Sequence, residues 1–370
     1  MSLEPPYPAL PLDAPWERPG IGADAPDGPP GPWHLPWDRL APAEAARIRE
    51  RLDGRAYGFQ ATDPATGDPV RRIFTGDRLR ADAEQTARLL APYTPGAIVS
   101  FAPPRHAYGA AATVLLPAVT GLPVWFWPGD CPPPAVPARR IAVVAIPSAF
   151  RALARHPRWT ASFEQLIFLH GGAELPPEAR RFEADPRAVL IELLGSTETG
   201  SVAHRTGWDP AGPWTLLDDV AFAAPRTGAE GPLTVTGPRL SALPDGSPPD
   251  RHEMDDVVRR LGDRLFLRLG RRAQLVRVGG VRYDLGAIAA RLRAALPGAD
   301  VACVRVPGPA GPPHEEAYDL LVAGGGPLTA DGVRAAARGL GAEPRLVRLV
   351  DRIPRGPLGK PLPAQLTPPD

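Results

Sequence analysis

Short apolar runs alternate with amphipathic stretches through the first 200 residues of the chain. The apolar runs have the length of buried strands, whereas the stretches between them place apolar residues at helical spacing. Strand after helix in this order is typical of a parallel sheet covered by helices. The predicted strands span 97–101, 123–127, 141–146, 166–169 and 188–194. The predicted helices span 41–52, 78–90, 108–122, 148–154 (with Ser148 as the expected N-cap) and 176–184.

The pattern changes after Gly200. Segments between 215 and 269 are short and are separated by turn signals such as Pro244-Asp245-Gly246, which predicts a small antiparallel or barrel-like region. Gly270-Arg271-Arg272 lies between two further apolar runs and has the composition of a hairpin connection. The last part alternates helices (285–296, 331–340) with strands (301–306, 318–322, 345–350).

The predicted fold class is therefore α/β, with two domains. A large N-terminal domain has a mostly parallel sheet covered by helices plus a small barrel-like β region, and a small α+β domain that can bury its own core follows it. The first residues are rich in proline, and we expect Trp16, Trp33 and Trp37 to anchor them on the body. The predicted parts are an arm at 1–40, a core at 41–269, a hinge at 270–272 and a C-terminal domain at 273–370.

Charge and cysteine content exclude several classes of protein. The 42 basic and 41 acidic residues give no electrostatic case for nucleic acid or an anionic membrane. Cys131 and Cys303 fit neither a disulfide framework nor a metal cluster. No secretory leader is recognisable, and no apolar run reaches the roughly 18 residues of a membrane span. We therefore expect a cytoplasmic protein.

The richest chemical signal is the loop Gly195-Ser196-Thr197-Glu198-Thr199-Gly200, which follows the predicted strand at 188–194. Loops at the carboxyl ends of strands are where open α/β sheets bind ligands. Hydroxyl groups suit phosphate oxygens, and the Glu198 carboxylate suits a hard cation such as Mg²⁺. The alternative is a Ser/Thr-rich turn whose carboxylate only caps it.

Four other segments stand in a fixed order with this loop. Their order and spacing, from about residue 97 to residue 360, resemble the adenylate-forming (ANL) superfamily of acyl-CoA synthetases, aryl-CoA ligases and peptide-synthetase adenylation domains. The loop itself, the stretch GRRAQLVRVGGVRYDLGAI and the terminal PRGPLGK carry most of the resemblance. The other segments are Arg105–Gly109, Gly171–Pro176, Asp255-Asp256-Val257 with Gly270-Arg271, and Ile353–Lys360.

The resemblance implies an enzyme that joins a carboxylic acid to ATP with Mg²⁺, giving an acyl-AMP and pyrophosphate. The acyl group then passes to a thiol of CoA or of an acyl carrier protein, while the C-terminal domain moves. It also implies an aryl or short acyl acid and a role in bacterial secondary metabolism.

The resemblance also assigns roles to individual residues. Lys360, on a glycine-flanked loop, matches the catalytic lysine, and it is the only lysine in the chain. Thr197 matches the phosphate-contacting threonine, and Glu198 matches the metal carboxylate. The implied nucleotide-binding residues are Gly172, Ala173, Glu174, Gly195, Ser196, Asp255, Arg271, Thr66 and Gly67. The implied substrate pocket contains His106, Tyr108, Gly171 and Gly200. Trp125, Phe126 and Trp127 either line this pocket or pack in the core, and core packing is favoured.

One segment departs from the family pattern. The family's phosphate loop ends in a lysine and wraps the β- and γ-phosphates, whereas the best match here, Ala61–Val70, has Asp63 within it and Val70 at the lysine position. A carboxylate and a missing cation both oppose triphosphate binding. Three interpretations stay open: an active shortened ligase, an enzyme with an altered first step, and a non-catalytic adenylate-binding or scaffold protein.

Overall fold

The computed structural model describes residues 31–62, 69–173, 175–242, 246–247, 249–278, 281–307, 316–324, 326, 328–340 and 343–354. Contacts between residues divide the chain into two compact units. The larger unit comprises Met1–Met254 and Arg259–Leu267, and the smaller unit comprises Asp255–Val258 and Arg268–Asp370.

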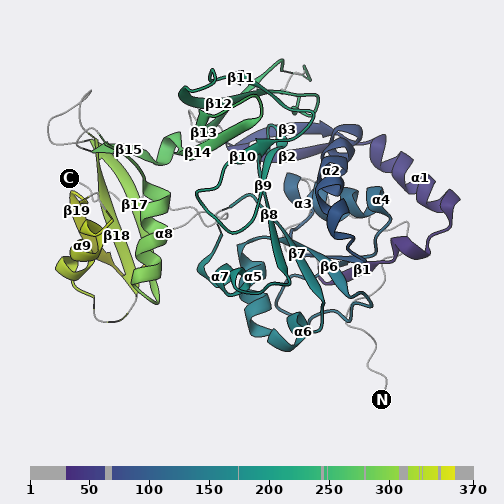
Figure 1. Cartoon of the computed structure of the whole chain (residues 1–370), viewed down its shortest axis with the longest axis horizontal. Coiled ribbons are helices and arrows are strands. Elements are labelled where there is room, and N and C mark those ends of the chain that lie inside the picture. The colour runs from purple at the N-terminus through teal and green to yellow at the C-terminus, as the bar shows by residue number, and fades with distance from the viewer. Residues whose placement is uncertain are drawn as a thin grey trace. The chain divides into compact units, whose positions relative to one another are not determined.

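A mixed sheet forms the framework of the larger unit (Figure 1). Its strands β5, β4, β6, β7 and β8 are parallel neighbours, and β1 and β9 add to them in the antiparallel sense. The strand order is β1-β5-β4-β6-β7-β8-β9-β10-β14-β13-β12-β11. The bounds are β1 Trp33–Leu35, β4 Ala97–Ser100, β5 Val124–Phe126, β6 Arg140–Ala145, β7 Gln165–Gly171, β8 Ala188–Ser196, β9 Gly200–Thr206, β10 Trp214–Leu216, β11 Ala221–Ala224, β12 Glu230–Thr236, β13 His252–Arg260 and β14 Leu265–Arg271.

Helices cover both faces of the parallel strands, so that neighbouring strand residues enter two different cores. Ile98 and Val144 pack in one core with α1, α2 and α4, whereas Val99 and Val143 pack in the other with α5. Burial on both faces explains why these strands read as continuous apolar runs. The helices are α1 Pro42–Asp53, α2 Gly76–Leu90, α3 Ala107–Gly109, α4 Leu116–Thr120, α5 Pro147–Arg155, α6 Pro157–Ala161 and α7 Arg180–Glu183, with a π-helical segment at Ala110–Leu115 and 3₁₀ turns at Trp37–Arg39, Ala91–Tyr93 and Pro177–Ala179.

A separate antiparallel hairpin joins β2 (Ala56–Thr62) to β3 (Pro69–Thr75). Its register runs from Thr62 opposite Pro69 to Ala56 opposite Thr75. Phe59 and Phe74 bury one face of the hairpin in the core shared with α1 and α2. The backbone of β3 also pairs at Ile73 with Ala242.

The smaller unit has a sheet of order β17-β18-β19 and a two-stranded sheet of β15 and β16. Leu292, Tyr318 and Val333 pack in its core. The carboxylate of Asp284 caps α8, because it accepts hydrogen bonds from the backbone amides of Gly286 (2.8 Å) and Ala287 (3.3 Å). The bounds are β15 Leu275–Val278, β16 Val281–Asp284, α8 Leu285–Ala295, β17 Ala299–Pro307, β18 Glu316–Gly324, α9 Ala330–Arg338 and β19 Leu346–Val350, with a 3₁₀ turn at Arg272–Gln274.

The predicted α/β fold class is confirmed, and two local predictions are wrong. Helix α5 begins at Pro147, so Ile146 and not Ser148 occupies the cap position, because proline is preset for the first helical residue. The stretch Gly270–Arg272 is not a hairpin connection. Both edges of β14 are already paired, with β10 and β13, so β15 pairs with β16 instead.

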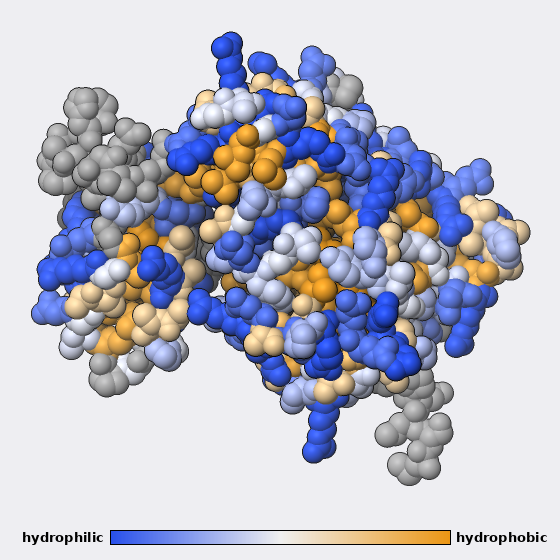
Figure 2. Space-filling view, viewed as in Figure 1, coloured by the Kyte–Doolittle hydropathy of each residue, from blue (hydrophilic) through white to orange (hydrophobic). Residues whose placement is uncertain are grey.

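Four of the tryptophans that the sequence singles out have places in the larger unit. Trp37 is buried, and Trp33 stacks on Phe126 with ring centroids 5.5 Å apart, while Trp16 lies outside the described residues. Trp125 and Trp127 are buried in the core that contains α5, so core packing accounts for them. Figure 2 shows hydrophilic residues over much of the visible face, interrupted by small hydrophobic groups. The part of the chain that the structure describes has no helix long and apolar enough to cross a membrane.

Candidate active site

The loop from Gly195 to Gly200 is a tight connection between β8 and β9, with Ser196 opposite Gly200. Its shape depends on the buried hydroxyl of Thr199, which accepts a hydrogen bond from the Ser196 amide (3.1 Å) and donates one to the Gly200 carbonyl (2.8 Å). Thr197 lies at the tip, half-buried, and its hydroxyl makes no hydrogen bond within the described residues. The loop therefore uses one threonine to hold its shape and leaves the other available.

Glycine is required at both ends of this loop. A Cβ atom on Gly195 would collide with the carbonyl of Gly200, and Gly200 has a φ of 65°, which side chains rarely adopt. The two strands therefore approach more closely here than larger residues allow. This close approach holds Thr197 and Glu198 at the end of the parallel part of the sheet.

A buried network of charges supports the far side of the loop. Asp82 on α2 accepts a hydrogen bond from the Ser201 amide (2.9 Å) and forms an ion pair with Arg239. Arg239 also donates to both carboxylate oxygens of Asp219 (2.6 and 2.9 Å). These residues were not predicted from the sequence, although Asp82 stands on the apolar stripe of its helix, three residues after Leu79. A charged residue on the apolar face of a helix indicates a buried and paired side chain, and this was the signal in the sequence.

Glu198 has a cationic neighbour that the sequence analysis did not identify. Its Oε1 lies 3.9 Å from Nε of Arg72 on β3, and both side chains are mostly buried. His252, at the start of β13, lies near both charges: burial lowers its pKa most, Glu198 raises it, and Arg72 lowers it. Glu198 is thus a carboxylate held within a small polar cluster of the larger unit.

The donors around Glu198 fit only one kind of magnesium site. No group of three or more His, Cys, Asp or Glu side chains within the described ranges can hold a metal ion. Mg²⁺ is commonly bound through one or two carboxylates together with substrate phosphates and waters. The single carboxylate of Glu198 therefore suits a metal that phosphate oxygens help to hold.

A second loop, Gly171-Gly172-Ala173, follows β7 and lies beside the first, because Gly171 is in register with Leu193 of β8. Buried His170 holds it, with Nε2 2.9 Å from the Ala173 carbonyl and Nδ1 3.3 Å from the Ala145 carbonyl. Burial lowers the pKa of His170, so at neutral pH the ring is uncharged and donates one hydrogen bond. The shorter distance assigns that bond to Ala173.

Tyr108 lies beneath the same loop. Its hydroxyl donates to the Leu169 carbonyl (2.7 Å), and a Cβ atom on Gly171 would lie 3.2 Å from its ring. Burial raises the pKa of Tyr108, so this hydroxyl keeps its proton. His106, by contrast, is exposed. Tyr108 therefore supports the strand end and the glycine loop together.

Two predicted nucleotide-binding residues lie in β13 and β14, in the parts of these strands that are assigned to the smaller unit. Asp255 is half-buried, whereas its neighbour Asp256 is buried and accepts a hydrogen bond from Nε of Arg268 (2.6 Å). Arg271 ends β14 and is half-buried. The predicted residues Lys360, Thr66, Gly67 and Glu174 lie outside the described residues.

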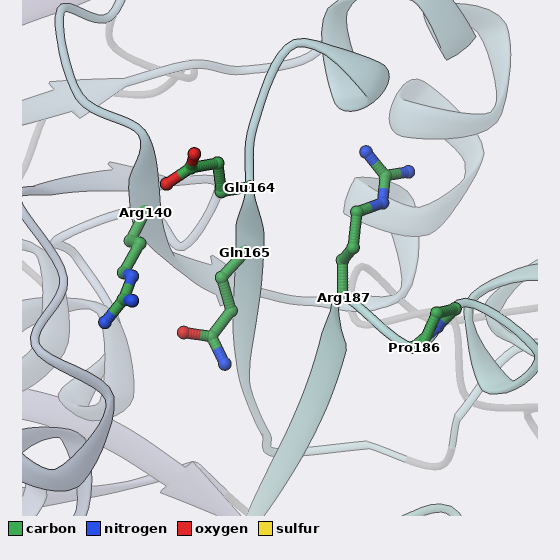
Figure 3. A pocket seen from close by; sticks show the side chains of 5 residues that line it. All are labelled: Arg140, Glu164, Gln165, Pro186 and Arg187. Atoms are coloured by element: carbon green, nitrogen blue, oxygen red, sulfur yellow. The ribbon is translucent and has the colours of Figure 1, made fainter.

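A shallow hollow of about 550 Å³ lies at the opposite ends of the same strands (Figure 3). Arg140 and Gln165 begin β6 and β7, and Arg187 immediately precedes β8. Its charged side chains have partners nearby: Arg187 donates to Asp185 (2.7 Å), Glu164 pairs with Arg139, and Arg140 donates to the Thr94 hydroxyl (3.0 Å). This hollow is therefore separate from the two loops at the carboxyl ends.

Two adjacent strand-end loops, one rich in hydroxyls and one rich in glycine, are the geometry expected of a nucleotide site in an α/β sheet. A family model described as AMP-binding enzyme matches residues 78–230, which contain both loops. Over these residues the chain is similar to that family. The resemblance to the adenylate-forming superfamily is thereby confirmed.

Similar proteins are known from both sequence and structure. The chain is 27% identical over 272 residues to a 4-coumarate–CoA ligase of Rhodobacter capsulatus, covering 71% of this chain and 65% of that protein. It is 25% identical to a 4-coumarate–CoA ligase of Halorhodospira halophila, covering 63% of this chain and 55% of that protein. The chain thus spans less than two thirds of the length of these relatives.

Two solved structures share the fold of this chain. ATP-bound MatB from Rhodopseudomonas palustris superposes with a TM-score of 0.62 at 20% identity, covering 84% of this chain and 67% of that one. The o-succinylbenzoate CoA synthetase of Bacillus subtilis, in complex with its acyl-adenylate intermediate, gives 0.65 at 16% identity, covering 85% and 69%.

Proposed function

We propose that this protein activates a carboxylic acid with ATP and transfers the acyl group to a thiol. The observation that carries the proposal is that the two threonines of the Gly195–Gly200 loop have different roles. The Thr199 hydroxyl forms hydrogen bonds within the loop, while the Thr197 hydroxyl and the Glu198 carboxylate are held at the strand end beside the Gly171–Ala173 loop. A loop that served only as a turn has no need of the second hydroxyl.

The chemistry has two steps. In the first, a carboxylate oxygen attacks the α-phosphorus of ATP, and the bond from that phosphorus to the leaving pyrophosphate breaks. In the second, a thiol loses its proton and its sulfur attacks the acyl carbon, which releases AMP. Mg²⁺, when bound, neutralises charge on the phosphates.

This chain's own residues serve mainly to position the nucleotide and to neutralise the negative charge on its phosphates. The Thr197 hydroxyl donates to a phosphate oxygen, and Glu198 supplies the one carboxylate that a phosphate-bound metal needs. Lys360 brings an ammonium group to the charge that develops in the first step. The Gly171–Ala173 loop, held by His170, lies along the adenine, and Glu174 continues it.

For the ribose hydroxyls we favour Asp255 over Asp256. Asp256 is buried, whereas the half-buried Asp255 has accessible surface for hydroxyl donors. Arg271 completes the proposed nucleotide contacts. The proposal therefore predicts that Asp255→Asn weakens AMP binding, and that Asp256→Asn lowers the melting temperature because it weakens the ion pair with Arg268.

The named relatives favour an aryl acid as substrate and CoA as acceptor, because both are 4-coumarate–CoA ligases. A short acyl acid is the alternative substrate, and an acyl carrier protein is the alternative acceptor. His106 and Tyr108, with Gly171 and Gly200, are the residues proposed to line the acyl site. We place the reaction in the cytoplasm.

Pyrophosphate release tests the proposal. The intact protein is incubated with ATP, Mg²⁺ and a panel of aryl and short aliphatic acids, and release is followed with and without CoA. We expect release with at least one acid and a loss of about 10²- to 10³-fold in Lys360→Ala, the range for removing one transition-state donor. Lys360→Arg is the matched control, because it keeps the charge but not the compact ammonium.

A second candidate function is an adenylate-using enzyme with an altered first step. The observation that favours it is Val70, which stands where the family's phosphate loop has lysine. On this alternative no acid releases pyrophosphate, yet AMP still raises the melting temperature; AMP at roughly 100 times its Kd adds about 2.7 kcal/mol. Absence of both signals would contradict both candidates.

A further inference from the structure

Arg72 is a cation whose hydrogen-bonding capacity is largely unused. It stands on β3 opposite Phe59, on the same face of the hairpin as the buried Phe74. Its Nε atom is buried and has no hydrogen-bond partner among the residues that the structure describes. Its ion pair with Glu198 spans 3.9 Å, whereas a charge-assisted hydrogen bond is about 2.7–2.9 Å long. A guanidinium has five N–H donors, so most of its capacity remains for another acceptor.

The backbone holds Arg72 close to the predicted phosphate-contacting loop. The Ser241 amide donates to the Glu198 carbonyl (2.8 Å), and the Ala242 amide donates to the Ile73 carbonyl (2.9 Å). These bonds tie β3 and the loop to one short segment of the larger unit. The hydroxyl of Ser241 is also fully buried, and none of the described residues forms a hydrogen bond with it. Unpartnered buried donors are costly, so an acceptor that reaches them is strongly favoured.

Arg72 lies near the position at which the family's phosphate loop has a lysine that this chain lacks. The family's phosphate loop supplies a lysine where this chain has Val70, and residues 70 and 72 share one face of β3 because side chains alternate along a strand. The chain therefore carries a cation two residues further along, on the same face. A guanidinium also suits a phosphate group better than an ammonium does, because it can donate two parallel hydrogen bonds.

We propose that Arg72 is the phosphate-binding cation of this protein, and that it binds the pyrophosphate portion of ATP in place of the missing lysine. This inference rests on the proposed function, since it assumes an ATP site at Thr197 and Glu198. The loose contact to Glu198 is the resting arrangement. With the triphosphate bound, Arg72 would donate to its oxygens, and the Glu198 carboxylate would be the residue that holds the metal.

Binding measurements separate this role from a structural one. The dissociation constants of ATP, pyrophosphate and AMP are measured by calorimetry with Mg²⁺ on the intact protein and on Arg72→Gln. We expect ATP and pyrophosphate to bind about 10- to 100-fold more weakly, the effect of one lost hydrogen bond to a charged group. AMP lacks the pyrophosphate portion, so its affinity changes by less than about twofold.

Arg71→Gln is the matched control. Arg71 is the preceding residue, and its exposed side chain lies over Gly58 on the opposite face of the hairpin. We expect it to leave all three affinities unchanged. Arg72→Lys should recover part of the ATP affinity, since it restores the charge. An equal loss of ATP and AMP affinity in Arg72→Gln, or no loss of either, would overturn the inference.

A second variant decides the question if Arg72→Gln folds poorly. Glu198→Gln removes the negative charge that holds Arg72, so pyrophosphate without metal should bind at least as tightly as it does to the unaltered protein. Weaker binding would count against the inference. If the unaltered protein binds ATP but no acid releases pyrophosphate, the proposed function fails while the Arg72 comparison still decides this inference. If it binds neither ATP nor pyrophosphate, both fail.

Discussion

The carboxylate of Asp82 accepts a hydrogen bond of 2.9 Å from the backbone amide of Ser201, so helix α2 supports the first residues of β9. The two residues are 119 positions apart in the chain. Arg239 pairs with the same carboxylate and is itself held by Asp219. Residues from four distant segments thus meet in a buried network directly behind the hydroxyl-rich loop.

Removing one member of this network should be strongly destabilising. Asp82→Ala leaves the buried Arg239 with one carboxylate fewer and the Ser201 amide without its acceptor. We expect a loss of about 3–5 kcal/mol in the free energy of unfolding, the range for breaking a buried ion pair from one side. Urea denaturation followed by circular dichroism measures it.

Asp218→Ala is the matched control for Asp82→Ala. Its side chain is 62% exposed and pairs only at the surface, so we expect a change below about 1 kcal/mol. Equal effects of the two substitutions would contradict a structural role for the buried network.

The two threonines of the loop should respond differently to removal of the hydroxyl. Thr199→Val removes the acceptor for the Ser196 amide and the donor to the Gly200 carbonyl, so the melting temperature should fall. Thr197→Val removes no hydrogen bond within the described residues, so the melting temperature should stay the same while ATP affinity drops. Differential scanning fluorimetry and calorimetry measure the two effects. The opposite pattern would assign the phosphate contact to Thr199.

Gly195→Ala should disturb the loop more than an alanine elsewhere. The added methyl group meets the backbone of Gly200 and Ser201, which cannot move without separating β8 from β9. We expect a loss of about 1–3 kcal/mol, as for overpacking, together with loss of AMP binding. Gly262→Ala is the control, because its methyl group meets nothing within 4 Å. A stable Gly195→Ala protein with normal AMP affinity would refute the tight-turn account.

His170 should make stability depend on pH. Burial lowers its folded-state pKa below the ordinary value of 6.5. The unfolded chain therefore takes up a proton near pH 6.5 that the folded chain does not, and stability is lost as the pH falls below that value. His170→Gln should reduce the slope of stability against pH by up to about 1.4 kcal/mol per pH unit between pH 6.5 and 5.

A measurement at pH 8 serves as the control for the His170→Gln prediction. At pH 8 neither state holds the extra proton, so the difference between His170→Gln and the unaltered protein there reports packing alone. Urea denaturation at several pH values separates the two effects. Parallel stability curves from pH 8 to pH 5 would show that His170 does not contribute to the pH dependence.

The regular elements of this fold follow closely from local pattern. The apolar runs at 141–146 and 188–194 correspond to β6 and β8, and the amphipathic segment at 78–90 corresponds to α2. These predictions succeed because strands buried on both faces and helices with one apolar face carry their periodicity within a few residues. The prediction of a hairpin at Gly270–Arg272 was wrong because the pairing of β14 depends on strands that are remote in sequence, which a local pattern does not reveal.

The sequence by itself determined the order of strands and helices, the glycines of the two loops and the candidate pair Thr197 and Glu198, since each depends on residue type and spacing along the chain. Only the tertiary structure decided which threonine braces the loop, which of Asp255 and Asp256 is buried, and that Arg72 lies beside Glu198. These facts depend on which distant segments share a buried space, and burial makes an unpaired charge or hydroxyl costly. Spacing along the chain contains no information about that neighbourhood.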